Sequence, residues 1–316
     1  MAITLPAYKN NLLGLVQNAC GELGLTVPTS VVGNGDTTAT LMLYLAARVG
    51  AEIYQAPTKN GGWQILRQQA QFTTASSGLI TGTFTSGSAT ITGVSSTSAV
   101  VAGMQVVSYG NVVYPTTVVS KTSNTITMSG NAVATSSSGV SFYCGQDSYA
   151  LPTDFSFFIT QTWWDGNFRW QLLGPLEAQE WAVLKFGISP TGPRRRFRII
   201  NNAFYIDPVP NDNGSTIAYE YYSAYWVQSL AGTTKAAFTL DTDQSLLDDD
   251  LMVFGLKWRY KQRAGLDYSL EKADYDACLQ RVMSRDGGNR NLPLNASASG
   301  IRLLNNQNVP DTGFGS

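Results

Sequence analysis

The sequence predicts an α+β protein: a four-helix bundle from both chain ends, a β domain, and a small all-β module inserted in that domain. Three observations favour this class. Apolar residues recur at helical spacing near both ends of the chain. Short alternating runs of apolar and polar residues fill its middle. Within that middle, residues 77–142 are mostly Ser, Thr, Gly and Val, and Lys121 is their only charged side chain.

Residues 241–286, near the C-terminus, predict a helical hairpin. The apolar residues of its first helix are spaced 4, 3 and 4 apart on one face: Leu247, Leu251, Phe254 and Trp258. Three aspartates at 248–250 stand in the first turn, where the helix dipole favours anions, and basic residues crowd the last turn. Gly265 takes the place of a left-handed cap, and Asp267 or Ser269 can begin a second helix. The apolar face of that second helix is Tyr275, Cys278 and Val282.

Two helices near the N-terminus provide a partner for this hairpin, because two amphipathic helices bury little by themselves. The first is expected over residues 6–24, closed by Gly24, with this apolar stripe: Leu13, Val16, Cys20 and Leu23. The second is expected from Asp36 or Thr37 to about Gln55, with this face: Leu41, Leu45, Val49 and Ile53. Together the two pairs predict the four-helix bundle. The alternative is two separate pairs, each lying on a sheet.

The β domain is expected at residues 61–76 and 145–240, beginning with a strand over 62–75. A short helix is expected over 176–186, with Trp181 and Leu184 available for its buried side. Three strands should follow: Arg194–Ile200, Ala203–Ile206 and Thr216–Trp226. The first two flank Asn201-Asn202, a pair that suggests a hairpin turn.

The inserted module is expected at residues 77–144. Its short runs, such as Val112-Val113-Tyr114, alternate regularly between Gly and Ser turns, which argues against low-complexity disorder. The remaining parts are the N-terminal bundle helices (1–60), the C-terminal hairpin (241–286) and a polar, extended arm (287–316). We expect the arm to become ordered only on a partner, through six isolated apolar residues: Leu292, Leu294, Ile301, Leu303, Leu304 and Phe314.

Composition excludes several kinds of chemistry. The chain has no histidine, which removes Ser-His-Asp and Cys-His catalysis and every His-based metal site. Its three cysteines fit no CxxC pattern, which favours free thiols in a reducing compartment. The glycines form no phosphate loop, so we expect no cofactor. The N-terminus is unlike a signal peptide, and no run of about 18 apolar residues predicts a membrane span.

Two charged clusters remain as candidate sites. The aspartates at 248–250 could serve an acid/base reaction, but their place at a helix N-terminus already explains them, and we expect no enzyme. The sharpest basic cluster is Arg194, Arg195, Arg196 and Arg198. On a strand, Arg194, Arg196 and Arg198 would share one face. That face is either solvated, paired with a neighbouring subunit, or turned toward DNA in a channel, although the net charge of −1 carries no global signature of a nucleic-acid binder.

Six stretches of the sequence resemble one known family. They are YALPTDF, WWDGNFRWQLLGPLEAQEW, RRRFRIINNAFYIDPVP, YEYYSAYWV, DTDQSLLDDDLMVFGLKWRYKQRAGLDY and YDACLQRVMSRDGG. The family is that of the head-to-tail adaptors of short-tailed bacteriophages, also called head–tail connectors or tail tubular protein A-like proteins. The resemblance covers residues 1–75 and 145–290 and leaves out the inserted module.

This resemblance implies a structural virion protein at the head–tail interface, made in the cytoplasm of the bacterial host. Such adaptors form a ring, usually dodecameric, between the portal protein and the tail nozzle protein. Their ring lines the channel for the genomic DNA, and their C-terminal arm commonly reaches the portal. The implied partners are therefore further copies of the chain, the portal, the nozzle and DNA, with no membrane.

Two rival functions stay open at this point. The inserted module could bind a host glycan, although it offers only Tyr109 and Tyr114 as aromatic platforms beside its polar side chains. The protein could instead be a polysaccharide hydrolase carried on the virion, which would need a pair of carboxylates in a cleft. Binding of a host surface extract would favour the first alternative, and zymography would reveal the second.

Overall fold

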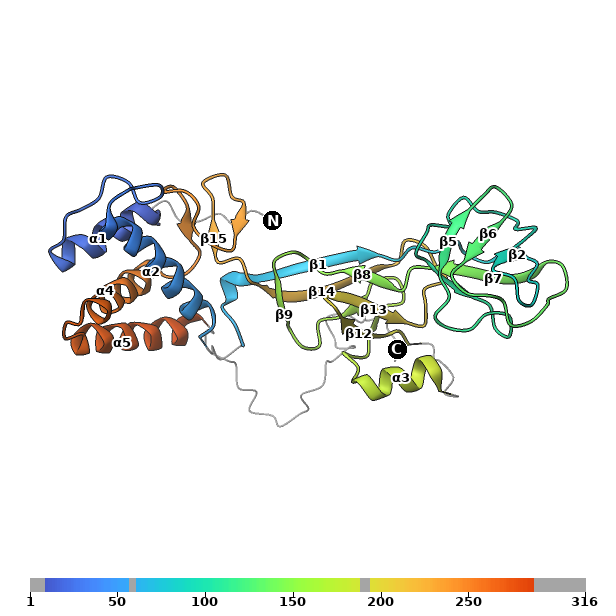
Figure 1. The fold of residues 1–316 in the computed structure, drawn as a ribbon. Coiled ribbons are helices and arrows are strands. Elements are labelled where there is room, and N and C mark those ends of the chain that lie inside the picture. Colours follow the sequence, from blue (N-terminus) through green and yellow to red (C-terminus); the bar gives the residue numbers. More distant parts are fainter. Residues whose placement is uncertain (1–8, 57–60, 188–193, 287–316) are drawn as a thin grey trace, which may run out of the picture.

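A computed structural model describes residues 9–56, 61–187 and 194–286 of the chain. These residues form five α-helices and several small antiparallel sheets, which confirms the predicted α+β class. The molecule is elongated (Figure 1). The helices from the two chain ends gather at one end, strands β1 (Arg67–Thr73) and β14 (Thr216–Ser223) run along the middle, and a small β module lies at the other end.

Four helices from the two chain ends share one hydrophobic core. They are α1 (Leu12–Leu23), α2 (Thr37–Tyr54), α4 (Asp249–Ala264) and α5 (Ser269–Asp286). Helix α4 is central and packs along each of the other three. Both chain ends therefore contribute to one core rather than to two separate helical pairs. A four-helix bundle in the strict sense stays a prediction.

Local signals define most ends of these helices. The carboxylates of Asp36 and Asp248 accept hydrogen bonds from the backbone N–H groups of Ala39 and Leu251, both at 3.0 Å. Asp36 caps α2 as predicted, whereas Asp248, which was expected in the first turn, is the residue that caps α4. Gly265 ends α4 with a φ of 70°, a left-handed conformation that glycine adopts without strain. The predicted start of α1 at residue 6 was too early. Asn11 caps this helix because it is extended and pairs with Gln244.

Two glycines allow close approaches within the helical core. A Cβ at Gly255 of α4 would lie 2.3 Å from Cγ1 of Val49 in α2. A Cβ at Gly50 of α2 would lie 2.1 Å from the ring of Trp226. Helical periodicity cannot reveal such contacts, because the second partner comes from a distant part of the chain.

A small sheet joins the helical core from the segment that follows β14. Its strands are β15 (Val227–Gln228), β16 (Thr234–Lys235) and β17 (Gln244–Ser245). Trp226, Val227 and Phe238 from this segment are buried among the helices. These three residues were expected in the β domain. They pack elsewhere because the sheet β15–β17 covers the helices and not the aromatic core of the middle.

The middle of the molecule holds two sheets around an aromatic core. The larger sheet has the order β1-β14-β10-β11, with β9 also paired to β14. Its remaining strands are β9 (Phe155–Phe158), β10 (Trp164–Asp165) and β11 (Trp170–Gln171). The smaller sheet consists of β12 (Arg196–Ile200), β13 (Ala203–Asp207) and β8 (Ser148–Ala150). Between them Phe197 and Phe204 stack with ring centroids 4.4 Å apart.

Two local predictions for this region can be checked. The strand expected over 62–75 begins only at Arg67, because a short 3-10 helix, η1 (Gln64–Leu66), precedes it. The hairpin at Asn201-Asn202 is confirmed: both residues have positive φ, and Ile200 pairs with Ala203. The predicted short helix is α3 (Ala178–Phe186), which buries Trp181.

The inserted module is built from two three-stranded sheets, β2-β7-β4 and β3-β6-β5. Its strands are β2 (Ile80–Gly82), β3 (Thr90–Ile91), β4 (Gln105–Val107), β5 (Val118–Lys121), β6 (Ile126–Met128) and β7 (Val140–Gly145). Its two ends lie side by side, because the N–H of Ser77 donates to the carbonyl of Cys144 at 2.8 Å. The run Val112-Val113-Tyr114 is a loop instead of a strand, and its tyrosine faces the middle of the molecule.

Candidate functional site

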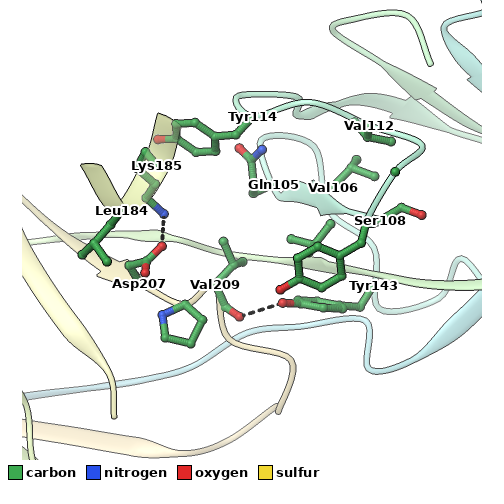
Figure 2. Close-up of a pocket in the computed structure, with 14 residues that line it drawn as sticks. Gln105, Val106, Ser108, Val112, Tyr114, Tyr143, Leu184, Lys185, Asp207 and Val209 are labelled. Carbon is green, nitrogen blue, oxygen red and sulfur yellow. Dashed lines mark hydrogen bonds and ion pairs between the residues drawn. The ribbon is translucent and has the colours of Figure 1, made fainter. Parts of the chain in front are cut away.

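A pocket lies where the inserted module meets the middle of the molecule (Figure 2). Its volume is about 250 Å³. The module contributes β4 and the loop that follows it, and the middle contributes the end of α3 and the turn after β13. Its polar and aromatic lining residues include Gln105, Ser108, Tyr109, Tyr114, Tyr143, Lys185 and Asp207. We call this cavity the junction pocket.

A buried ion pair forms one wall of the junction pocket. The Nζ of Lys185 lies 2.7 Å from Oδ1 of Asp207, and the two side chains are only 4% and 6% exposed. The same ammonium lies 4.8 Å from the ring centroid of Tyr114 and 4.9 Å from that of Trp181. Cations are attracted to aromatic faces at such distances. Lys185 therefore links α3 to the inserted module through Tyr114.

Burial shapes the acid–base properties of the pocket. It raises the pKa of Tyr143 to about 12, and the nearby Tyr109 and Asp207 add to this effect. The hydroxyl of Tyr143 donates to the carbonyl of Val209 at 3.2 Å. Burial also raises the pKa of Tyr114, with a further contribution from Asp147. Tyr114 and Tyr143 therefore stay protonated at neutral pH and can donate or accept hydrogen bonds.

The basic cluster predicted from the sequence divides into two parts. Arg194 is exposed, and Arg196 and Arg198 are half-buried, whereas Arg195 is 9% exposed. Strand β12 begins only at Arg196, so Arg194 does not lie on the predicted strand face, whereas Arg196 and Arg198 alternate with the buried Phe197 as predicted. Arg198 donates to the carbonyl of Ala178 in α3 at 3.4 Å.

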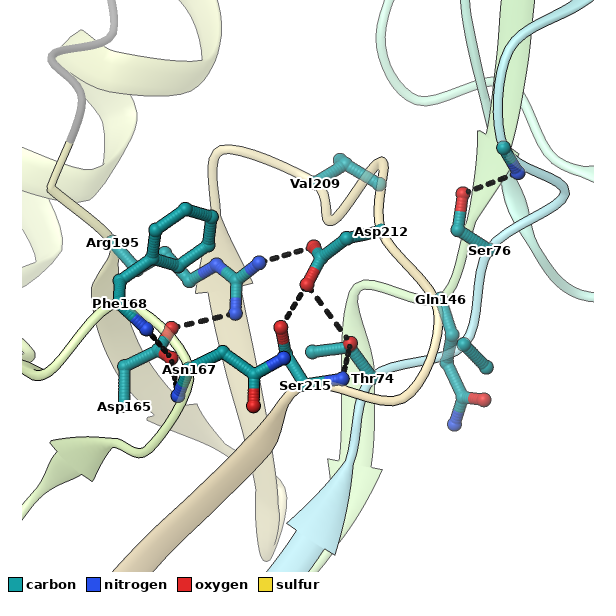
Figure 3. A network of polar contacts seen from close by, with 12 residues as sticks. Thr74, Ser76, Gln146, Asp165, Asn167, Phe168, Arg195, Val209, Asp212 and Ser215 are labelled. Atoms are coloured by element: carbon teal, nitrogen blue, oxygen red, sulfur yellow. Dashed lines mark hydrogen bonds and ion pairs between the residues drawn. The ribbon is translucent and has the colours of Figure 1, made fainter.

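Arg195 is held inside the chain by two carboxylates (Figure 3). Its Nη1 lies 2.7 Å from Oδ2 of Asp165, and its Nη2 pairs with Asp212. Asp165 also accepts hydrogen bonds from the backbone N–H groups of Asn167 and Phe168, at 3.0 and 3.1 Å. This network joins the turn after β10, the start of β12 and the turn before β14. The sequence contained no signal for it, because the two carboxylates are 30 and 17 positions away from Arg195.

The acidic cluster at 248–250 has structural roles at the start of α4. Asp248 caps the helix through its bond to Leu251. Asp249 pairs with Lys9 at 2.8 Å and accepts a hydrogen bond from the backbone N–H of Asn10 at 2.7 Å. These contacts agree with the helix-terminus interpretation of the cluster.

Other expectations concern metals, membranes and the C-terminal arm. In the described ranges no group of three His, Cys, Asp or Glu residues is placed to hold a metal ion. No helix of the described chain has the length and apolar character needed to cross a membrane. The six apolar residues of the arm lie outside the described residues, so their role stays a prediction.

Comparison with known proteins identifies the family. The protein-family model described as SU10 adaptor protein matches residues 124–297, which is more than half of the chain. The match begins in the inserted module and runs through the middle of the molecule, α4 and α5. A search of curated proteins found no match. The chain belongs to the SU10 adaptor protein family of phage adaptors.

Proposed function

We propose that this phage adaptor forms a ring between the portal protein and the tail nozzle protein, of the dodecameric type found in the head-to-tail adaptors that it resembles. The match to the SU10 adaptor protein family over residues 124–297 carries this proposal, because that family consists of structural phage proteins. In this role the protein is a component of the virion and not an enzyme. Its ring would enclose the channel through which the genomic DNA passes.

The parts of the chain have separate tasks in this proposal. The proposed four-helix bundle of residues 1–60 and 241–286 would form one end of an elongated subunit, and the module of residues 77–144 would form the other. The position of α1, α2, α4 and α5 at the end opposite the β module supports this assignment (Figure 1). The β domain of residues 61–76 and 145–240 connects them. A long subunit of this kind can touch its neighbours along its length and still present different surfaces to the portal and the nozzle.

The surface around β12 and α3 is our candidate for contact between subunits. A hollow of about 590 Å³ lies here, lined mainly by α3 and by Arg196. Phe186 of α3 is exposed, as are Phe168 and Trp170 near Arg195. Protein interfaces are enriched in aromatic residues and arginine. Arg194, Arg196 and Arg198 would pair with a neighbouring copy here or face DNA in the channel.

Electron microscopy of the purified chain with portal rings tests the ring directly. We expect closed rings of adaptor subunits on the portal. A monomeric state in the absence of portal agrees with the proposal, because the assembly of such rings can require the portal as a template. Particles that carry single or irregularly placed subunits would contradict it.

The C-terminal arm is the proposed portal contact. Deletion of residues 287–316 removes Leu292, Leu294, Ile301, Leu303, Leu304 and Phe314 together. Each of these side chains returns about 1.5–3 kcal/mol if it is fully buried, which can offset the cost of ordering the chain. We expect the truncated protein to keep its melting temperature and to bind portal rings more weakly. Unchanged affinity for the portal would remove this role from the arm.

The alternative of a glycan-binding virion protein is less favoured, because the family match concerns an adaptor. Tyr109 and Tyr114 both line the junction pocket, but Tyr114 is already in contact with Lys185 and Phe186. This leaves only one of the two aromatic platforms accessible for a sugar ring.

A further inference from the structure

Strand β1 forms an open edge of the larger sheet. It pairs with β14 in one continuous register, and no other strand of the described ranges pairs with its opposite side. Residues 67–73 contain no proline, their register with β14 shows no bulge, and their only charged side chain is that of Arg67. Prolines, bulges and repeated charges are the means by which proteins usually protect an exposed edge strand. The edge of β1 is therefore suited to accept a further strand.

Hydrogen bonds around β14 fix the direction of the backbone groups of β1. The carbonyl of Glu220 in β14 accepts from Ile159, on the side away from β1, at 3.0 Å. Its partner across the sheet, Gln69, therefore directs its N–H and C=O groups outward, because backbone groups alternate between the two sides of a strand. Thr74 agrees with this phase, since its N–H donates toward β14, to the carbonyl of Ser215, at 2.8 Å. The residues with outward backbone groups are thus Arg67, Gln69, Gln71 and Thr73.

The two faces of β1 differ in polarity. The side chains of Gln69 and Gln71 are exposed, whereas Ala70 and Phe72 are half-buried and pack against the aromatic core. The ring of Phe72 stacks on that of Tyr149 with centroids 4.3 Å apart. A strand added to β1 would extend this half-buried face, so it needs apolar residues at alternate positions. Polar residues between them would lie beside the glutamines.

One stretch of the chain outside the described residues has this pattern. Residues 301–309, IRLLNNQNV, form a run without glycine or proline, and no other run of seven such residues occurs within the segments outside the described ranges. On a strand, Ile301, Leu303 and Val309 would share one face, and the other face would be polar except for Leu304. The run is also as long as β1 requires.

The arm that carries this run starts beside the start of β1. The carboxylate of Asp286, at the end of α5, accepts from the backbone N–H of Gln64 at 3.1 and 3.2 Å, and Gln64 is three residues before β1. Residues 287–300 then precede the run, and these fourteen residues can span about 50 Å. β1 lies along the length of the molecule (Figure 1), so the run can reach β1 of a copy that lies alongside.

We propose that residues 301–309 of one subunit add as a strand to the open edge of β1 in the neighbouring copy. Main-chain hydrogen bonds would provide the affinity, and the half-buried face of Ala70 and Phe72 the specificity. Donor and acceptor are different surfaces of the same chain, which is the kind of contact that closes a ring. The inference rests on the ring proposed above. It assigns this stretch of the arm to the next subunit and leaves the other apolar residues of the arm for the portal.

Cross-linking of mixed single-cysteine variants of the full-length chain tests this arrangement. One population carries Gln71→Cys at the open edge and the other carries Asn305→Cys in the arm. A flexible bis-maleimide reagent is added in the presence of portal rings, and the wild-type protein, whose cysteines are buried, gives the background. We expect a two-chain product in the mixture and only background from either variant alone. Tyr44→Cys mixed with Asn305→Cys is the matched control and should give only background, because Tyr44 is 70% exposed on α2, outside the sheet.

The outcomes separate the strand pairing from the ring. Closed rings on the portal without a cross-linked product would overturn the pairing and leave the ring proposal standing. Cross-linked pairs without closed rings would support the pairing and contradict the ring. A product within single chains of the double variant Gln71→Cys/Asn305→Cys, with none in the mixture, would show that each arm covers its own β1 and would overturn the assignment to the neighbour.

Proline variants show whether the main chain carries the contact. Gln69→Pro, added to the Gln71→Cys chain, removes an N–H that points away from β14, which is a position where an edge strand tolerates proline. It should reduce the two-chain product about 5- to 10-fold. If this variant fails to fold, Leu303→Pro in the Asn305→Cys chain keeps the test decisive, because it changes only the arm. Ala298→Pro, before the run, is its matched control and should leave the product unchanged. An undiminished product in Leu303→Pro would overturn the proposal.

Discussion

Replacement of Arg195 by alanine should destabilise the middle of the molecule by about 3–5 kcal/mol, the usual cost of removing one partner from a buried ion pair. The guanidinium of Arg195 is nearly inaccessible and contacts two carboxylates from different segments. Alanine would leave Asp165, whose side chain is 4% exposed, without its cation. The two backbone N–H groups that also bind Asp165 would remain.

The structure indicates the lower half of this range. Asp212 has a side chain that is 27% exposed, so water can replace part of its lost contact. Asp165 keeps its two hydrogen bonds from backbone N–H groups and therefore loses only its ionic partner. The ring of Phe168, 5.1 Å from the guanidinium carbon, loses its packing on Arg195. A destabilisation of about 3–4 kcal/mol follows from these contributions.

Urea denaturation followed by tryptophan fluorescence measures this change, since Trp170 pairs with Asp165 across β10 and β11 and lines a small cavity together with Arg195. Arg198→Ala is the matched control. Arg198 is half-buried, and its hydrogen bond to Ala178 is long, so its loss should cost less than about 1 kcal/mol. The double variant Arg195→Ala/Asp165→Asn should recover part of the loss, because it removes the unpaired charge. Equal effects of the Arg195 and Arg198 variants would refute the reasoning.

Three further predictions concern the helices, the module and the junction. Gly255→Ala should lower the free energy of unfolding by about 1–3 kcal/mol, because the added methyl group would overpack against Val49. Gly21→Ala, on an open face of α1, should raise it by about 0.5–1 kcal/mol. Thermal unfolding of both variants measures the difference. Replacement of residues 77–142 by a short Gly/Ser linker should leave the unfolding of the helical part nearly unchanged, because the module's ends adjoin; loss of soluble protein would count against this. Burial raises the pKa of Tyr143 to about 12 in the folded state, so folding favours the protonated form of this residue. The stability that this preference contributes is complete below the unfolded pKa of about 10 and is lost as the pH rises toward 12. Tyr143→Phe should flatten this alkaline decline in a pH series of denaturation curves, and an unchanged slope would show that other groups cause it.

The features that the sequence predicted well depend on neighbours along the chain. An aspartate at 36 or 248 can cap its own helix whatever surrounds it, because its acceptor and the N–H that it binds are three residues apart. The turn at Asn201-Asn202 is equally local. The composition of residues 77–142 marked a β module, whose strands pair with one another, although the last of them, β7, extends to Gly145.

The candidate sites depend on contacts between distant segments. Arg195 looked like one member of an exposed basic run, and only the packing of three segments turned it inward toward Asp165 and Asp212. The junction pocket needs α3, the end of β13 and a loop of the inserted module in one place. No spacing of residues in the sequence predicts that these three segments come together.

The sequence by itself determined the α+β class, the caps and amphipathic faces of the helices, and the inserted module, since these follow from interactions over a few residues. Only the tertiary structure decided that α4 is central, that Trp226 packs on Gly50, and that Lys185 and Asp207 form a buried pair. The physical reason is that a buried group loses its contacts with water and needs a partner inside the protein, and any segment of the chain can provide that partner. Which segment supplies them is set by the packing of the whole molecule.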